Sequence, residues 1–519
     1  MSIQEAANRS EVDQPMAALI HNAGAIRAVT EAVAGTLGPK GLDCMLVDEC
    51  GDALVTNDGV TILKTMDITH PAARILINAA QYQEEEVGDG TTTTAVMIGA
   101  LVNEGVNQVL RGVPVIKVIE GIDSGISRAL NWLGQMAQPV DDINHPVLER
   151  VASIAGRGHR ELARLIVQAA RLVGGEKLRE PGFKLADQIL ALEGSESSLI
   201  QGTIITREPI NRQMPRQVAD TRIVILDDAL EPQKVAAEAL GSKAGFEQQL
   251  HNEQLLRENL QKLAQIGVQA IFTDRAISDG AEDLLTDLGI IGVARVAMHE
   301  WRRLAELTGA RPLKRTSLAK PALELLKLTG QAAEIRVNER FKQIQVLGKP
   351  EQKYVTVLVG AFTKEVVGER ERIAKDTAAA VQAAWNGGIV PGGGSAELAV
   401  ARLLEQEPLR GMAGYGFQCV IESLKKPLAQ ICVNAGFNAL EKVSEVIAAQ
   451  LEQHSNSIGI DCEDGTVIDL AAAGVYDPFL VKYHALKSAG EVAEAILRIQ
   501  TIIKMKEERE PLLEKTWDN

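Results

Sequence analysis

The first long stretch with a periodic hydrophobic pattern covers residues 16–37. Apolar side chains recur there every three or four residues, which is the spacing of a helix with one buried face. Gly35 and the Gly38-Pro39 pair should end this helix, because glycine and proline interrupt helical structure. A second helix is predicted over residues 71–86.

Short apolar segments lie between these two helices. A strand is expected at 45–47, and two further segments at 54–56 and 60–63 flank the pair Asp58-Gly59. Asp-Gly between two such segments is typical of a β-hairpin turn. Taken alone, this pattern assigns Asp58 to the turn and to nothing else.

The middle of the chain changes character near residue 203. From about 143 to 202 the pattern is helical but less apolar. Beyond it, β-branched strands alternate with helical segments, an arrangement typical of a small α/β domain. The expected strands are 222–226, 268–272 and 290–296, and the expected helices are 279–288 and 302–307.

Residues 231–265 form a long insertion between the first two of these strands. The second half places Leu256, Leu260 and Leu263 on one helical face, and the first half, around 239–246, is loop-like with exposed apolar residues. Insertions of this length in a compact domain are often functional. A surface helix with an irregular approach explains the pattern nearly as well.

The C-terminal third is mainly helical. A strand is expected at 355–359, and helices are expected at 369–385, 397–404 and through most of 411–512, with an interruption at 474–478. The sequence therefore predicts a mainly α protein with an α/β part.

The most informative polar segment is Val-Gly-Asp-Gly-Thr-Thr-Thr-Thr at 87–94, directly before an apolar helix. Gly88 and Gly90 allow positive φ and a close approach to a ligand. A threonine cap at the helix start would leave free N–H groups, which together with the helix dipole favour a phosphate. Asp89 adds a hard oxygen ligand suited to Mg²⁺.

Two other glycine motifs differ in how strongly they indicate phosphate binding. Gly348-Lys349 is followed by Pro350, so the chain has no P-loop. Three glycines at 392–394 precede another helix and provide a second candidate phosphate contact. A flexible hinge explains that second loop equally well.

Composition excludes several classes of function. The chain has 519 residues, of which 46% are apolar, and a net charge of −15. This charge argues against binding to nucleic acid or to an anionic membrane. Five cysteines form no Cys-x-x-Cys pair, which fits a reducing compartment. We find no secretory signal and no membrane-spanning segment, so a cytoplasmic protein is expected.

Four segments stand in the order and spacing found in chaperonins. They are Leu-Gly-Pro-Lys-Gly at 37–41, Thr-Asn-Asp-Gly at 56–59, Gly-Asp-Gly-Thr-Thr-Thr at 88–93 and Pro-Gly-Gly-Gly at 391–394. Residues 474–478 also match, so the chain resembles this family over nearly its whole length. Segments 70–73, 86–88 and 309–311 resemble the group II branch, which includes the thermosome and the eukaryotic cytosolic chaperonin.

The resemblance implies a protomer of three domains nested in sequence. A helical equatorial ATP-binding domain would contain 1–142 and 389–519. An intermediate hinge domain would contain 143–202 and 355–388, and an apical domain with a helical protrusion would contain 203–354. Protomers would form two stacked rings of about eight copies each around a chamber. ATP would close this chamber over unfolded or partly folded client proteins, without a separate lid co-chaperonin.

The resemblance also implies roles for individual residues. Asp89 would hold Mg²⁺, and Asp58 and Asp376 would position and activate the attacking water. These roles suit phosphoryl transfer, which depends on positioning and charge neutralisation. The implied nucleotide-binding residues are Leu37, Gly38, Pro39, Gly59, Gly90, Thr91, Thr92, Thr93, Gly393 and Asp477.

Three segments depart from the group II pattern. The nucleotide-sensing loop usually contains a lysine, but residues 155–159 read Ala-Gly-Arg-Gly-His; segment 359–363 lacks the usual Arg-Gly-Gly; and residues 504–519 form a charged C-terminus. These departures fit the divergent bacterial branch called group III.

Two other classes of function are compatible with the phosphate loops. A small-molecule phosphotransferase would need a compact substrate pocket and would be a monomer or dimer, which the separate α/β domain argues against. A scaffold that keeps the ring but has lost hydrolysis would not need Asp58, Asp89 and Asp376.

Overall fold

The computed structural model describes residues 15–502, apart from 49, 52, 237, 239–241, 409 and 410. The chain divides into two compact units. The first unit combines both ends of the chain, Met1–Ala163 and Lys375–Asn519, and the second unit is the intervening segment Arg164–Ala374.

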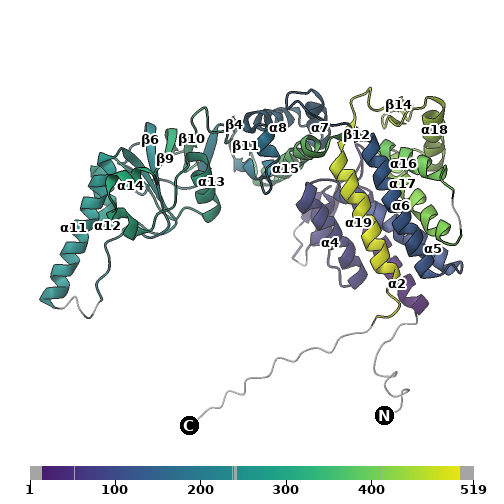
Figure 1. The fold of residues 1–519 in the computed structure, drawn as a ribbon, viewed down its shortest axis with the longest axis horizontal. Helices are drawn as coiled ribbons and strands as arrows, with labels where there is room; N and C mark the ends of the chain where they lie inside the picture. The colour runs from purple at the N-terminus through teal and green to yellow at the C-terminus, as the bar shows by residue number, and fades with distance from the viewer. Residues whose placement is uncertain are drawn as a thin grey trace, which may run out of the picture. The chain divides into compact units, whose positions relative to one another are not determined.

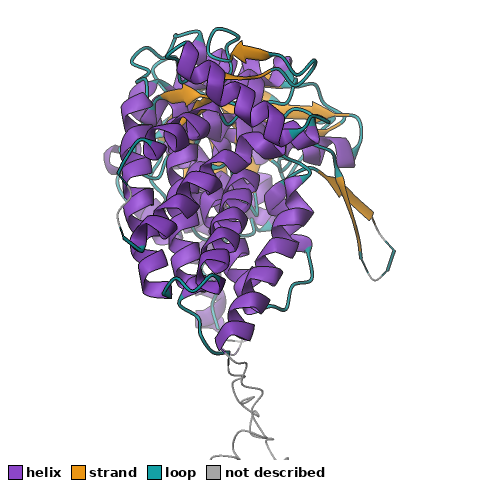
Figure 2. Cartoon of the chain, turned by 90° about the vertical axis from the view of Figure 1, so that its right-hand side faces the viewer, coloured by secondary structure: helices purple, strands orange, loops and turns teal. Residues whose placement is uncertain are grey.

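Helices dominate the first unit, in which several run side by side (Figures 1 and 2). Its helices are α2 (Pro15–Ala34), α3 (Gly59–Thr65), α4 (Pro71–Val87), α5 (Thr91–Leu110), α6 (Val115–Met136), α7 (Val147–Ala155), α16 (Ser395–Glu405), α17 (Ala413–Asn434), α18 (Ala439–Glu452) and α19 (Phe479–Leu497). Two further helices, α8 (Arg160–Val173) and α15 (Lys364–Gly387), cross the boundaries between the units. No helix within the described ranges is long and apolar enough to cross a membrane.

Short antiparallel strand pairs complete the first unit. They are β1 (Cys44–Val47) with β2 (Ala53–Thr56), β12 (Ile389–Pro391) with β15 (Tyr476–Pro478), and β13 (Ile458–Ile460) with β14 (Val467–Asp469). The second pair joins the C-terminal end of α15 to the start of α19, two segments that are far apart in the sequence.

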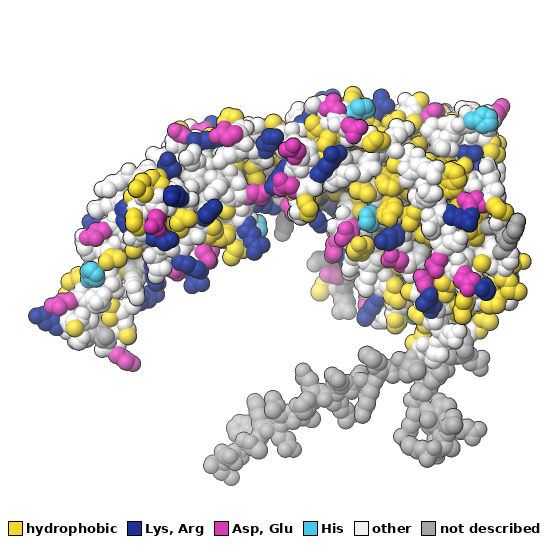
Figure 3. Space-filling model, viewed as in Figure 1, with side chains coloured by type: hydrophobic (Ala, Val, Ile, Leu, Met, Phe, Trp, Pro, Cys, Tyr) yellow, Lys and Arg dark blue, Asp and Glu magenta, His cyan; other side chains and the backbone are white. Residues whose placement is uncertain are grey.

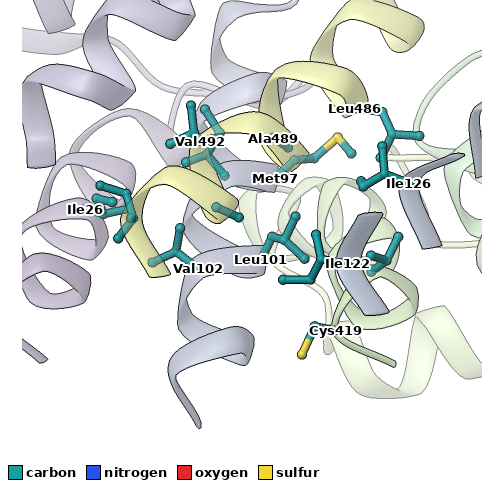
Figure 4. Packing of buried hydrophobic residues seen from close by; sticks show 14 of the residues in the cluster. Ile26, Met97, Leu101, Val102, Ile122, Ile126, Cys419, Leu486, Ala489 and Val492 are labelled. Atoms are coloured by element: carbon teal, nitrogen blue, oxygen red, sulfur yellow. The ribbon is translucent and has the colours of Figure 1, made fainter. Parts of the chain in front are cut away.

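The core of the first unit forms around α5. Buried side chains such as Met97, Leu101 and Val102 project from this helix toward its neighbours (Figure 4). Ile26 of α2 and Ile122 of α6 reach the same cluster. Nearly all of these side chains are aliphatic and pack closely against one another. Two helices come closer together where the residue between them is small.

The second unit contains a mixed six-stranded sheet in the order β5-β10-β9-β6-β7-β8. Its strands are β5 (Gly202–Ile205), β6 (Gln217–Leu226), β7 (Val268–Thr273), β8 (Ile291–Val293), β9 (Gly330–Asn338) and β10 (Gln343–Leu347). The pairs β6-β7 and β7-β8 are parallel, as the predicted strand–helix alternation requires.

Helices cover both faces of this sheet. Alternate residues of β6 point to opposite faces, so Ile223 joins a cluster with α13 (Met298–Thr308), and Val224 joins one with α11 (Lys243–Gln265) and α12 (Asp279–Asp287). Short helices α9 (Gly175–Leu178) and α14 (Ala322–Leu326), two 3₁₀ turns (Leu185–Gln188 and Arg315–Ala319) and a three-stranded sheet complete the unit. That sheet is formed by β3 (Ile189–Glu193), β11 (Thr356–Ala361) and β4 (Ser198–Ile200).

Two expectations from the hydrophobic pattern are wrong. The hairpin joins β1 to β2, and residues 60–63 belong to helix α3, so Asp58-Gly59 is a helix start and not a hairpin turn. The helical pattern assigned to 143–202 ends early, because β3 and β4 pair with β11. Leucine-rich segments have high helix propensity, and strand pairing with a distant segment overrides it here.

Close packing between α6 and α17 generates a first prediction. A Cβ added at Gly121 would lie 2.0 Å from the Ala413 carbonyl oxygen, whereas one added at Gly134 in the same helix meets nothing within 4 Å. We expect Gly121→Ala to lower the stability of the protein by about 1–3 kcal/mol, because the backbones must separate. Gly134→Ala is the matched control and should stabilise by about 0.5–1 kcal/mol. Calorimetric Tm values that fall equally for both variants would contradict this interpretation.

Candidate functional site

The glycine-threonine loop is a tight connection between α4 and α5. Gly88 and Gly90 both have left-handed φ angles, +71° and +83°. An added Cβ would lie 2.3 Å from Cβ of Ala379 at Gly88, and 2.5 Å from Cγ1 of Val481 at Gly90. Both positions therefore require glycine for two reasons, the backbone conformation and the contacts with α15 and α19.

The start of α5 differs from the expected threonine cap. Gly90 is the N-cap residue and Thr91 is the first helical residue, and no side chain of the described residues caps this end. The first N–H groups of a 20-residue helix thus lack a side-chain acceptor at its positive end. This arrangement favours an anion such as phosphate.

Asp89 is held in place through its main chain and its side chain. Its Oδ1 accepts a hydrogen bond from the Gly90 N–H at 2.6 Å. The buried Gln83 Nε2 donates to the Asp89 carbonyl oxygen at 2.9 Å and to that of Val481 at 3.1 Å. Gln83 belongs to none of the recognised motifs, and sequence analysis missed it.

Electrostatics at Asp89 favour a cation. Desolvation raises the pKa of Asp89, with a smaller contribution from the charge of Asp477, while the Gly90 N–H, Arg157 and Lys482 oppose this rise. Within the described residues no cluster of three or more His, Cys, Asp or Glu could hold a metal unaided. Mg²⁺ commonly binds through one or two carboxylates together with substrate phosphates and water. The residues present therefore fit Mg²⁺ carried by a nucleotide.

Asp58 lies buried directly beside the threonine loop. Its Oδ2 caps α3 by accepting the N–H of Thr61 at 2.9 Å and the Thr61 hydroxyl at 2.5 Å. A Cβ added at Gly59 would lie 2.4 Å from Thr92 Oγ1. Arg157, which has φ +46°, donates a hydrogen bond to Asn57 Oδ1 from the loop after α7.

Asp376 approaches the same loop from α15. It is half-buried and lies one helical turn before Ala379, the residue that contacts Gly88. Residues three apart on a helix share a face. Asp58, Asp89 and Asp376, predicted from three distant segments of the sequence, thus lie on elements that contact one loop.

The second glycine loop lies beside Asp477. The pairing of β12 with β15 sets Val390 opposite Asp477, and a Cβ added at Gly392 would lie 3.0 Å from Asp477 Oδ1. Gly393 and Gly394 have φ angles of +63° and +79°, and Gly394 is the N-cap residue of α16 without a side-chain cap. The structure therefore places a second uncapped helix start there, in an ordered turn.

The C-terminal end of α17 supports two of the loops. Asn434 Nδ2 donates to the carbonyl oxygens of Ala34 at 2.9 Å and Leu37 at 2.8 Å, and a Cβ added at Gly38 would lie 3.1 Å from Ile431. One turn earlier, the backbone of Leu428 lies against Gly394. Pro39 follows in the same loop, and Thr36 Oγ1 links the loop to Thr92 Oγ1 at 3.3 Å. Asn434 is a further residue that carried no motif signal.

Threonine side chains line the start of α5. Thr91 and Thr93 are buried, with relative exposures of 6% and 8%, and Thr94 Oγ1 donates to the Gly90 carbonyl oxygen at 3.0 Å. The site therefore consists of two glycine loops, two helix starts and several carboxylates, which is the composition expected of a site for a magnesium–polyphosphate.

Comparison with known proteins identifies relatives over nearly the full chain. The model of the TCP-1/cpn60 chaperonin family matches residues 29–507. A thermosome subunit of Methanopyrus kandleri is 35% identical over 94% of this chain and 92% of the relative. One from Pyrococcus abyssi is 34% identical over 94% of this chain and 91% of the relative. A solved group III chaperonin in the open state superposes with a TM-score of 0.86 at 45% identity, over 94% of this chain and 99% of that chain.

The cap made by Asp58 generates a second prediction. Asp58→Ala removes the acceptor for Thr61, so α3 should lose about 1 kcal/mol and its amides should exchange roughly five times faster. Asp58→Asn keeps an oxygen in the cap and should leave exchange in α3 near that of the wild type. Equal amide exchange rates in the alanine and asparagine variants would show that the cap contributes nothing.

Proposed function

The chain belongs to the TCP-1/cpn60 chaperonin family, and we propose that it is an ATP-dependent chaperone that encloses client proteins in a double ring. Members of this family are ATPases that assemble as rings. The observation that carries the proposal for this chain is the convergence of Asp58, Asp89 and Asp376 on the uncapped start of α5. This cluster supplies the charge and the anion site that ATP hydrolysis requires.

The proposed roles follow from position. Thr91, Thr92 and Thr93 with Gly90 bind the phosphates at the α5 start, and Asp89 holds the Mg²⁺ that they carry. Mg²⁺ neutralises phosphate charge and lets carboxylates approach the attacking water.

The remaining carboxylates divide between water and nucleoside. Asp58 and Asp376 orient the water, and Asp58 is already fixed by its bonds to Thr61. Leu37, Gly38, Pro39, Gly59 and Gly393 line the nucleotide, and Asp477 contacts the nucleoside.

The proposed three domains divide the chain more finely than the two compact units do. The equatorial domain, 1–142 and 389–519, lies within the first unit, and the apical domain, 203–354, lies within the second. The intermediate domain, 143–202 and 355–388, includes α8 and α15, the helices that cross between units. It is therefore the part of the chain suited to act as a hinge.

The built-in lid is proposed for α11 and its approach. Leu256, Leu260 and Leu263 are buried against the sheet, whereas Phe246 and Leu250 nearer the N-terminal end are 58% and 50% exposed. Figure 1 shows where α11 lies, and Figure 3 shows apolar and charged side chains mixed near its N-terminal end. Residues 239–241 of the expected tip lie outside the described residues. Exposed apolar side chains favour reversible burial against neighbouring copies, so no separate lid protein is needed.

A phosphotransferase reading is less consistent with this architecture. Such an enzyme needs a substrate pocket beside the phosphates, whereas the second unit is a separate sheet domain of the chain. The relatives of this chain described above are thermosome subunits and a chaperonin.

Hydrolysis depends on the two aspartates in different ways. We expect Asp376→Asn to bind ATP normally and to lower the turnover of ATP about 10²–10⁴-fold, since water activation is lost. Asp89→Asn should weaken Mg²⁺-dependent ATP binding itself. Asp283→Asn, on an exposed position of α12, is the control for the substitution. Wild-type turnover in Asp376→Asn would remove its proposed role.

Chamber closure depends on the exposed end of α11. Native mass spectrometry should give about sixteen copies for the wild type and for Phe246→Ser/Leu250→Ser, because this end lies outside the buried core. The double variant should keep its ATPase but lose ATP-dependent protection of an enclosed client from protease. Leu323→Ser, at an equally apolar position that is 76% exposed on α14, should keep protection. A monomer or dimer would refute the ring, and full protection in the double variant would refute the lid.

A further inference from the structure

A buried lysine lies between the two glycine loops. The Lys482 side chain, in the first turn of α19, is only 8% exposed, and its Nζ lies 2.7 Å from Glu397 Oε1 and 2.8 Å from Asp477 Oδ2. Glu397 lies in the first turn of α16, directly after the second glycine loop, and is 4% exposed. Desolvation lowers the pKa of Lys482, but the charges of Asp477 and Glu397 outweigh it and raise the pKa, so the lysine stays charged.

This arrangement is a poor way to gain stability. Burying an ion pair costs desolvation energy, and the attraction between the two charges often does no more than offset that cost. Glu397 also leaves its Oε2 buried with no hydrogen-bond partner among the described residues. A cluster with these costs is better explained by what it positions than by the stability it contributes.

The geometry identifies Asp477 as the group that is positioned. Asp477 is the most exposed of the three, at 21%, and its two oxygens differ in environment. Oδ2 is bound by Lys482, and Oδ1 faces the glycine loop at Gly392. With Oδ2 occupied, the side chain has one orientation in which Oδ1 accepts a hydrogen bond from a ligand.

Lys482 is also coupled to the phosphate side of the site. The preceding residue, Val481, contacts Gly90 and accepts a hydrogen bond from Gln83, which also holds the Asp89 main chain. The charge of Lys482 acts on Asp89 as well as on Asp477. The first turn of α19 thus fixes both carboxylates relative to each other.

We propose that Lys482, anchored by Glu397, is a positioning residue that orients Asp477 for recognition of the nucleoside. The inference rests on the proposed function, because it assumes that ATP is the ligand. Neither Glu397 nor Lys482 contacts ATP in this arrangement. Their effect is to hold one carboxylate oxygen toward the nucleoside and to keep the lysine from moving to the phosphates.

The test compares two ligands that share phosphates but differ in the nucleoside. Glu397→Gln/Lys482→Met conserves net charge and leaves no new isolated charge beyond the partly exposed Asp477. Calorimetric titration of the assembled protein with Mg²⁺ should show ATP binding about tenfold weaker than in the wild type. Binding of inorganic tripolyphosphate, which has no nucleoside, should stay within about twofold of the wild type.

A second lysine in the first unit provides a matched control. Lys425 of α17 bridges Glu405 of α16 at 2.8 Å and Glu422 of α17 at 3.0 Å, and its side chain is more exposed than that of Lys482. Glu405→Gln/Lys425→Met makes the same changes away from the site and should alter neither ligand. Tm values of both variants report any general loss of folding.

Each outcome is decisive. A selective loss of ATP affinity supports the positioning role. An equal loss for both ligands, or no loss, overturns it and leaves the proposed function standing. If the milder Glu397→Gln alone also weakens ATP selectively, the anchor is confirmed even where the double variant folds poorly; if it does not, Glu397 has no such role. Failure of the wild type to bind ATP would overturn the proposed function and this inference together.

Discussion

Negative charge gathered around one short loop is the constraint on which the first unit depends. Asp89 lies in the connection between α4 and α5, the elements that carry Asp58 and Asp376 contact this connection or the start of α5, and Asp477 acts electrostatically on Asp89. Desolvation by burial is the main cause of the rise in the pKa of Asp89, and the negative charge of Asp477 adds to it. The structure offsets it with the positive starts of α5 and α16 and with Lys482, all fixed by the backbone or by burial. A magnesium nucleotide would complete this balance.

This constraint accounts for the chain's path. The site needs segments near residues 37, 58 and 89 from one end of the sequence and near 376, 393 and 477 from the other. Both ends of the chain must therefore fold into one unit. The segment between them, Arg164–Ala374, forms the second unit, which contains the six-stranded sheet. The glycines at 88 and 90 let α15 and α19 of the C-terminal part contact a loop of the N-terminal part. Inserting a side chain at either position would push the two parts of the site away from each other.

Much of this was predictable from local pattern. The helices around α5, the leucine face of α11 and the α/β character of the second unit follow from periodicity, and the motifs identified the family, which the comparisons confirm. Asp58 was misread because Asp-Gly is a turn signal whether a strand or a helix follows it, and the cap is visible only from the bonds to Thr61. Gln83 and Asn434 were missed because their partners Val481 and Ala34 lie 398 and 400 residues away, and Lys482 was missed because its partner Glu397 lies on another helix. Single polar residues in helices carry no signal of such distant contacts.

Helix α15 carries Asp376 and contains residues of both units. It begins at Lys364 in the second unit and ends at Gly387 in the first, and Asp376 lies in the part that belongs to the first unit. The contact of Ala379 with Gly88 sets how near Asp376 comes to the loop. Because a Cβ added at Gly88 would lie 2.3 Å from Cβ of Ala379, no larger residue fits at this contact without moving α15. Under the proposed function, the packing of Ala379 against Gly88 therefore helps to set the position of Asp376 beside the phosphate loop, and hydrolysis depends on such positioning.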